Sequence, residues 1–376
     1  MKRILALFLC FALTFCSLSG QDSFASASSA RKGAIKEIIS NMPDTGDYSS
    51  YAHLSEGGKK AYERFVKELE LFKGEITFFH YDPDDVYAAF LAVHRDHPEF
   101  FWLDGGSSVS TINLLFGKKI TYYPTTSGYE GGDIIKMARE LEVKVEEIIS
   151  LIPAGTSDYE KALFVHDYIV DNTYYDKSYS PTSKSAYSCL VLGKATCLGY
   201  SEAFQLLMKK LSIPCHMVTG SGQGSGHAWN YILIGSDYYY ADITWDDPTY
   251  TDPTKAPKGR SYDYFLITTE ELLLTHTLDE DQILPNCTQT KYNYFVYNGY
   301  YLEQYSFSQA SKIISEQFPS GRIYLKFSSD EQLQAAKKDL FDNDRIWKIK
   351  AVKASGISTL YHSTSEEGLL LTISLD

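Results

Sequence analysis

Basic residues are in deficit in this chain of 376 residues: 35 Lys and Arg stand against 48 Asp and Glu, for a formal net charge of -13. A negative surplus of this size is repelled by phosphate backbones and anionic bilayers, which argues against nucleic acid as a partner. Cysteine is also scarce, and six residues are too few for a disulfide framework in a chain of this length. Beyond the amino terminus, no apolar run reaches the roughly 20 residues that a membrane-spanning helix needs. We therefore expect a soluble globular protein of two or three domains.

The first 27 residues have the pattern of a secretory signal peptide. Basic residues at 2–3 precede an apolar run over 4–15, and small residues at 25–27 offer a cleavage site. The apolar run is too short to span a bilayer, and the bulky Phe15 disfavours a lipid anchor on Cys16. We therefore expect a secreted or extracellular protein, with association with the cell surface as an alternative.

Removal of this segment leaves four cysteines: Cys189, Cys197, Cys215 and Cys287. If one of them is a free nucleophile, at most one disulfide forms among the other three, and the sequence leaves open whether one does. Cys189 and Cys215 are expected to be small buried hydrophobic residues.

The order of helices and strands along the chain is typical of a modular α+β protein. We predict a signal peptide at 1–27, an N-terminal α+β domain at 28–150, a central domain at 151–285 and a C-terminal α/β module at 286–376. A capping box at Ser157 opens the central domain. Apolar spacing and capping residues predict helices over about 55–72, 84–95, 133–152, 157–172, 309–317 and after Ser329, strands over 109–116, 120–123, 322–327, 346–352 and 369–374, a hairpin at Asn298-Gly299 and an exposed loop at 249–260.

Cys197 carries the strongest chemical signal. It precedes a helix whose apolar residues, from Tyr200 to Leu211, recur at helical spacing. At a helix amino terminus, the dipole and the free backbone N–H groups favour a negatively charged sulfur, and the same N–H groups could stabilise an oxyanion. Gly199 is expected to leave room for a substrate. A nucleophilic cysteine also needs a proton acceptor, and histidine suits that task near neutral pH.

A histidine and an aspartate follow on a predicted β-hairpin. Two strand-like segments flank a Gly235-Ser236 turn, and a loop rich in Gly and Ser at 222–226 precedes the first of them. If the turn has only two residues, His227 and Asp242 lie on one face as diagonal neighbours. Asp242 could then hold the imidazole in the tautomer that a base needs. A loop one residue longer would place the two side chains on opposite faces.

Five segments of the central domain carry further motifs: Cys197-Leu198-Gly199-Tyr200-Ser201, Ile213-Pro214-Cys215, His227-Ala228-Trp229-Asn230, Asp242-Ile243-Thr244-Trp245-Asp246-Asp247-Pro248 and His166-Asp167-Tyr168-Ile169. Together they resemble the core of bacterial transglutaminase-like proteins over about residues 157–250. The segment 97–101 is similar, more loosely, to secreted clostridial proteins of this type. The resemblance implies a papain-like α+β fold, with the cysteine-bearing helix packed on an antiparallel sheet and two smaller modules at its flanks.

The resemblance also implies acyl transfer from a carboxamide through a thioester, with Cys197, His227 and Asp242 as the catalytic triad. Family members include cross-linking enzymes, peptidases, amidases and inactive relatives, so the fold alone does not decide the reaction. Family enzymes complete the oxyanion hole with a side chain upstream of the cysteine, for which Tyr187 is a weak candidate. Tyr200 and Trp229 could wall the acyl-binding cleft, and their alternative interpretation is as core residues.

Other polar residues of the central domain give weaker signals. His166 is expected in the core of a helix, and His216 and His276 have no partners at metal-ligand spacing, so zinc is not expected. Asp246 and Asp247 are expected to shape a turn and to be solvated. No calcium loop is present in the sequence, and no cofactor is expected.

We therefore predict a secreted, thiol-dependent acyltransferase for protein or peptide carboxamides, with surface proteins or cell-wall peptides as candidate substrates. A cysteine peptidase or amidase is one alternative. A non-catalytic surface-binding module on the same fold is the other. Faster alkylation of Cys197 by iodoacetamide than of the other cysteines would favour an enzyme over a binding module.

Overall fold

A computed structural model describes residues 49–71, 73–126, 131–247, 260–280, 282–365 and 368–375. The predicted signal peptide and nearly all of the predicted loop at 249–260 lie outside these residues. Residues 42–376 form one compact unit, and the described part combines helices with mostly antiparallel sheets, which confirms the α+β class. Among the described helices, none is long and apolar enough to cross a membrane. The domain boundaries given above stay predictions.

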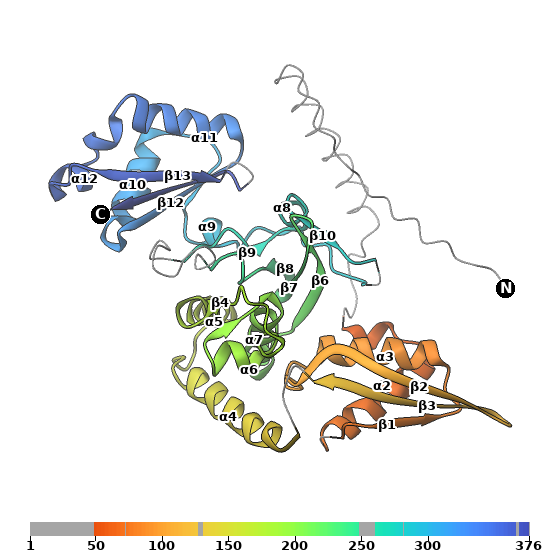
Figure 1. Cartoon of the computed structure of the whole chain (residues 1–376). Coiled ribbons are helices and arrows are strands. Elements are labelled where there is room, and N and C mark those ends of the chain that lie inside the picture. The colour runs from red at the N-terminus through yellow and green to blue at the C-terminus, as the bar shows by residue number, and fades with distance from the viewer. Residues whose placement is uncertain are drawn as a thin grey trace. The chain divides into compact units, whose positions relative to one another are not determined.

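The amino-terminal part is an antiparallel sheet of order β1-β3-β2 that is covered by helices on one face (Figure 1). Phe65 and Phe90 from two helices pack on Phe78 and Tyr122, which point to the same side of the sheet. Ser55 caps the first of these helices as predicted, because its hydroxyl accepts a hydrogen bond from a backbone N–H at 2.9 Å. The elements are α2 (Glu56–Leu69), β1 (Ile76–Phe79), α3 (Pro83–Asp96), β2 (Leu103–Leu114), β3 (Gly117–Thr126) and α4 (Gly131–Ser150).

The central part holds a sheet of order β10-β6-β7-β8-β9, against which α7 packs (Figure 1). Tyr200 and Phe204 of α7 are fully buried and join Ile232 of β7 in the main apolar core. The capping box at Ser157 opens α5 as predicted. The elements are α5 (Asp158–Asn172), β4 (Tyr174–Tyr175), α6 (Ala186–Leu190), β5 (Lys194–Ala195), α7 (Cys197–Lys210), β6 (Cys215–Gly222), β7 (Ser225–Ile234), β8 (Asp237–Ala241), β9 (Phe265–Ile267), α8 (Thr269–Leu272) and β10 (His276–Leu278).

The carboxyl-terminal part has a separate sheet, of order β11-β12-β14-β13, and a separate apolar core. The strand β11 runs parallel to β12, whereas the other pairs are antiparallel. Ser329 caps α11 as predicted. The elements are α9 (Tyr294–Tyr297), β11 (Tyr301–Leu302), α10 (Phe307–Gln317), β12 (Arg322–Phe327), α11 (Asp330–Lys337), α12 (Lys350–Ser355), β13 (Leu360–Ser365) and β14 (Leu370–Leu375).

Two predictions about the carboxyl-terminal part are wrong. Asn298 and Gly299 do not form a hairpin but end α9, and Gly299 has the left-handed φ of +74° that is common after a helix. Ile346, Ile349 and Val352 do not form a strand. Ile346 lies on a short 3-10 helix, Val352 lies on α12 and Ile349 joins the two, and a spacing of three residues buries all three side chains.

The glycine-rich segment at 222–226 is also not the loop that we expected. It is the tight connection of a hairpin, in which Gly222 ends β6 and Ser225 begins β7. The two residues between them, Gln223 and Gly224, both have positive φ, as two-residue hairpin turns require. His227 therefore lies on a paired strand rather than after a loose loop.

Candidate active site

Cys197 lies at the first position of α7, as predicted from the apolar spacing. The preceding residue, Thr196, does not cap the helix, because its hydroxyl donates instead to the carbonyl of Ser183 at 3.3 Å. The first intrahelical bond is that from the Tyr200 N–H to Thr196, so the N–H groups before Tyr200 precede the helical ladder. The first turn of α7 therefore presents a positive helix end at the sulfur.

The β7–β8 hairpin brings His227 to Asp242. Its register pairs Ile234 with Asp237 and so confirms the two-residue turn. The Nε2 atom of His227 lies 2.6 Å from Oδ2 of Asp242, and the same imidazole forms a hydrogen bond with the Cys197 thiol. Because Nε2 is engaged by the carboxylate, Nδ1 is the ring nitrogen that remains for the sulfur. The three residues predicted as a triad thus form one hydrogen-bonded series.

Asp242 is buried and accepts four hydrogen bonds. Its Oδ1 atom accepts from the N–H groups of Thr244 and Trp245, at 3.0 and 3.2 Å. Its Oδ2 atom is bonded to His227 and also to Nε2 of His276, at 3.2 Å. His276 itself is 2% exposed. His276, for which the sequence showed no partner at metal-ligand spacing, is thus a hydrogen-bond partner of Asp242.

The charges of this cluster depend on each other. Burial alone would lower the pKa of His227, but the negative charge of Asp242 and hydrogen bonds to Asp242 and Cys197 outweigh it and raise that pKa to about 10. Burial alone would raise the pKa of Asp242, but the charge of His227 and the bonds from both histidines hold it well below its usual range. The site thus favours an imidazolium beside a carboxylate at neutral pH.

His227, Asp242 and His276 are also the one group among the described residues whose ligand atoms lie close enough to hold a metal ion. The direct 2.6 Å contact between His227 and Asp242 is a hydrogen bond and leaves no room for an ion between these two atoms. We therefore interpret the group as a hydrogen-bonded cluster.

A pocket of about 1220 Å³ lies beside Cys197 and His227. Gly222 forms part of its wall, and a Cβ atom there would lie only 2.6 Å from the ring of Trp245 and 3.2 Å from that of His227. Glycine at this position therefore lets both rings approach the strand. Aromatic and cationic side chains give the pocket its character: Tyr175, Tyr179, Trp245, Tyr264, Lys177 and Lys184.

None of the three aromatic residues predicted to contact substrate lines this pocket. Tyr200 is fully buried and donates its hydroxyl hydrogen bond to Asp247, whereas Trp229 is 1% exposed within the sheet core. The hydroxyl of Tyr187 donates to Glu140 at 2.7 Å and so points to α4. The prediction that Tyr187, Tyr200 and Trp229 contact substrate is therefore wrong. Tyr200 and Trp229 are core residues, which was their alternative interpretation.

Gly199 does not leave room for a substrate either. A Cβ atom at this position would lie 2.8 Å from the carbonyl oxygen of Ser185 and 2.8 Å from Cβ of Ala195. The missing side chain therefore allows the first turn of α7 to pack against the protein's own backbone.

Tyr175, which the sequence analysis did not single out, is an aromatic residue of the wall of this pocket. It lies on β4, which pairs with β5 just before Cys197. Burial, followed by the charge of Cys197, raises the pKa of Tyr175 above its usual range. Its phenol therefore keeps its proton in the pocket that also contains Cys197. The only signal in the sequence was a tyrosine upstream of the cysteine, and this chain has 30 tyrosines.

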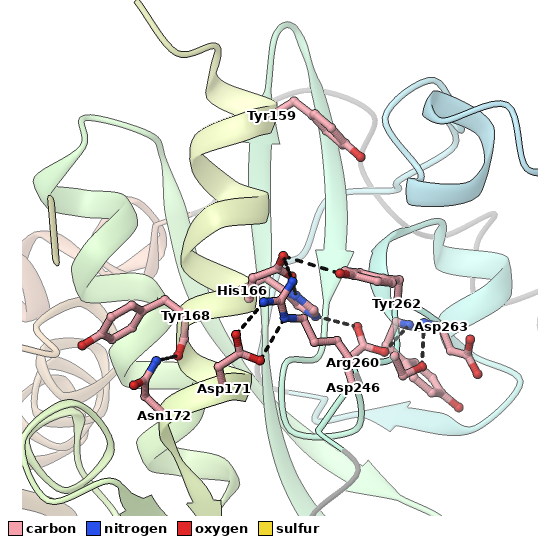
Figure 2. A network of polar contacts seen from close by, with 12 residues as sticks. Tyr159, His166, Tyr168, Asp171, Asn172, Asp246, Arg260, Tyr262 and Asp263 are labelled. Atoms are coloured by element: carbon pink, nitrogen blue, oxygen red, sulfur yellow. Dashed lines mark hydrogen bonds and ion pairs between the residues drawn. The ribbon is translucent and has the colours of Figure 1, made fainter. Parts of the chain in front are cut away.

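A second polar network, buried at His166 and Asp246, supports the segment after Asp242 (Figure 2). Nε2 of His166 on α5 lies 3.2 Å from Oδ2 of Asp246, and Nδ1 lies 3.0 Å from Asp167. Arg260 adds ion pairs to Asp167 and Asp171 on the same helix. The prediction that Asp246 and Asp247 are solvated is wrong, since both are fully buried.

The four cysteines remaining after the predicted signal peptide are all free thiols. Cys189 and Cys215 are buried, as expected, and so is Cys287, whereas Cys197 is partly exposed. Burial raises the pKa of Cys189 to about 12 and that of Cys215 well above its usual range. Cys197 is thus the accessible thiol among the described residues.

Comparison with known proteins agrees with this geometry. Residues 149–245 match the family model of the transglutaminase-like superfamily, so the chain carries a transglutaminase-like domain. This superfamily comprises thiol-dependent acyltransferases and peptidases. No curated protein matches the chain.

Three solved structures are similar over part of the chain. They are a TGase (14% identity, TM-score 0.27), a candidate cysteine protease from Cytophaga hutchinsonii (16%, 0.25) and a candidate protease from Parabacteroides distasonis (9%, 0.23). The similarity covers 41%, 38% and 37% of this chain and 50%, 63% and 36% of those chains. The chain thus spans less than two thirds of each.

Proposed function

We propose that this protein is an enzyme that transfers acyl groups from protein or peptide carboxamides through a thioester on Cys197. The observation that carries this proposal is the hydrogen-bonded series of Cys197, His227 and Asp242 at the positive end of α7, beside an open pocket. This arrangement meets the geometric criteria for a nucleophile, its acid–base partner and an orienting group.

The first half of the reaction forms the thioester. The Cys197 sulfur, which has given its proton to His227, attacks the carbonyl carbon and forms a tetrahedral oxyanion. When the intermediate collapses, the bond from carbon to nitrogen breaks, and the His227 imidazolium donates a proton to the leaving amine. The raised pKa of His227 supports this role, because it keeps the imidazole protonated before substrate arrives.

The second half releases the acyl group. The now neutral His227 takes a proton from the incoming nucleophile, which attacks the thioester and frees the Cys197 sulfur. Water as nucleophile makes the enzyme a peptidase, amidase or deamidase, whereas a lysine amine makes it a cross-linking transglutaminase. The pocket is wide enough to admit either water or a lysine side chain. We propose acyl transfer to an amine, with hydrolysis as the alternative.

The oxyanion is stabilised by two kinds of donor in this proposal. The backbone N–H groups at the start of α7 are one, since Thr196 does not cap them. The protonated phenol of Tyr175, in the pocket with Cys197, is the other and replaces Tyr187 in this role. His276 acts indirectly, because its bond to Asp242 fixes the carboxylate that orients His227.

We also propose that the enzyme acts outside the cytoplasm, on surface proteins or cell-wall peptides. The support is the basic, apolar and small-residue pattern of the first 27 residues. Amino-terminal sequencing of the protein recovered from the medium of producing cells should find a chain that begins at Ser28. A full-length chain retained inside the cells would contradict this.

The activity is tested by mass spectrometry of products. The mature protein is incubated with glutamine-containing peptides and with wall peptides, with and without a primary amine. We expect amine incorporation that disappears in Cys197→Ala and persists in Cys287→Ala, a matched change at a buried thiol. Cleavage or deamidation that needs Cys197 would establish the hydrolase instead.

The rate of cysteine alkylation distinguishes an enzyme, whether transferase or hydrolase, from a binding module. Cys197 should react with iodoacetamide faster than the buried thiols. His227→Ala should slow this reaction, because the imidazole that takes the thiol proton is lost. The catalytic proposal would be overturned if Cys197 reacted slowly, if His227→Ala did not affect this rate and if mass spectrometry found no change in any substrate. These results would favour the binding module.

A further inference from the structure

The β2–β3 hairpin has an exposed, apolar end. Every residue from 108 to 118 is exposed, and at the tip Leu115 and Phe116 are 90% and 79% exposed. Ile112 and Leu114, just behind the tip, are 53% and 41% exposed. In Figure 1 the paired ends of β2 and β3 extend beyond α2 and α3, so these helices do not cover them. Apolar surface left open in this way marks an interaction site.

The register extends this apolar surface over the open face of the sheet. Lys119 of β3 pairs with Phe79 of β1 and with Ile112 of β2, which places the three side chains in one row. Phe79 is 50% exposed, whereas its neighbour Phe78 is fully buried on the helix-covered face. The open face and the tip therefore form one continuous surface.

The charge of this surface differs from that of the chain. No Asp or Glu occurs from residue 105 to residue 129, although the chain has 48 of them and a net charge of -13. Lys118 and Lys119 follow the tip directly, and because successive strand residues alternate, they point to opposite faces of the hairpin. The tip is thus apolar at its end and cationic on both sides behind it.

We propose that this hairpin docks the protein on an anionic lipid bilayer, with Leu115 and Phe116 among the acyl chains and Lys118 and Lys119 at the headgroups. A deformable bilayer accepts a tip that is exposed on all sides, and long cationic side chains place their charge at the headgroup level. The net charge argues only against attraction of the whole molecule. The docking surface uses none of the residues assigned to acyl transfer.

The test is sedimentation with lipid vesicles, using residues 28–376, which include the whole compact unit. Binding to phosphatidylcholine vesicles containing phosphatidylglycerol should exceed binding to pure phosphatidylcholine and should weaken with salt. The double variant Leu115→Ser/Phe116→Ser should bind at least about tenfold more weakly, because two large apolar groups leave the bilayer. Lys118→Gln/Lys119→Gln should lose the preference for phosphatidylglycerol.

The matched control is Leu71→Ser/Leu151→Ser, which removes two leucines of 62% and 60% exposure outside the hairpin and should leave binding unchanged. Thermal unfolding should be alike for all variants, since the replaced side chains are exposed apart from Lys119, which is half-buried. Failure to bind either vesicle, or equal binding by the tip variant, would overturn the proposal. The protein could instead self-associate without lipid, and the tip variant could abolish that association. This result would also overturn the proposal and would assign the surface to a second copy of the chain.

Discussion

Asp242→Asn offers the sharpest test of the electrostatics of the site. The substitution keeps the size of the side chain and one acceptor for His227, but it removes the negative charge. Burial, which by itself lowers the pKa of His227, and the contact with Cys197, which raises it, both remain, whereas the charge of Asp242, the largest raising cause, is lost. The pKa of His227 should therefore fall from about 10 towards its ordinary value of 6.5.

The size of this shift fixes the loss of activity. At pH 8 the imidazolium form of His227 would fall from about 99% to about 3% of molecules for a pKa of 6.5. If that form donates the proton to the leaving amine, turnover that depends on Cys197 should fall roughly 30-fold at pH 8 and less at pH 6.

Nuclear magnetic resonance of labelled histidine follows His227 directly, and product analysis between pH 6 and pH 9 follows turnover. The matched control is Asp263→Asn, since Asp263 is another carboxyl, partly buried in the pocket wall, but is not among the groups that shift His227. Should His227 of the unmodified protein titrate near 6.5, or keep its high pKa in Asp242→Asn, the reasoning would be refuted.

Three further predictions follow from single contacts. His276→Phe should lower kcat about tenfold with little change in KM, because Asp242 loses a donor that holds it in place; a change in KM alone would argue against this role. The free energy of unfolding should fall as pH rises from 6.5 through about 9, since folded His166 keeps a proton that the unfolded chain has lost. In urea unfolding of His166→Gln, the slope of this free energy against pH should be smaller by up to about 1.4 kcal/mol per pH unit. An identical slope would exclude His166 as the cause. Gly199→Ala should cost about 1–3 kcal/mol in urea unfolding, because its Cβ would meet the carbonyl of Ser185 at 2.8 Å, and unchanged stability would disprove this clash.

Local rules were enough to predict the central geometry. Helical spacing placed Cys197 at the start of a helix, and the strict alternation of strand residues, with a two-residue turn, placed His227 and Asp242 on one face. Each of these inferences depends on residues that are close in sequence. The same kind of local reasoning located the caps at Ser55 and Ser157.

Partners that are distant in sequence could not be predicted in this way. His276 comes 34 residues after Asp242 and reaches it only because β10 pairs with β6 at the edge of the sheet. His166 and Asp246 are 80 residues apart. A single sequence contains no signal for such long-range pairing, so these polar groups looked like isolated surface or core residues.

Tyr187 shows the opposite error, in which closeness in sequence was misleading. It lies ten positions before Cys197, but the short helix α6 directs its hydroxyl to Glu140 instead. Tyr175, further upstream, lines the pocket through the β4–β5 pair. The direction of a side chain depended here on the fold around it and not on its distance along the chain.

The burial of Cys189, Cys215 and Cys287 has a consequence for the lifetime of the protein. A cysteine oxidised by peroxide is normally rescued by a second thiol that forms a disulfide with it. Here the other three described thiols are buried, and burial raises the pKa of each, so none is a ready thiolate. A sulfenic acid on Cys197 would therefore be oxidised by a second molecule of peroxide to the irreversible sulfinic form unless a small external thiol met it first. In oxidising surroundings, each molecule would work for a limited time and then be permanently silenced.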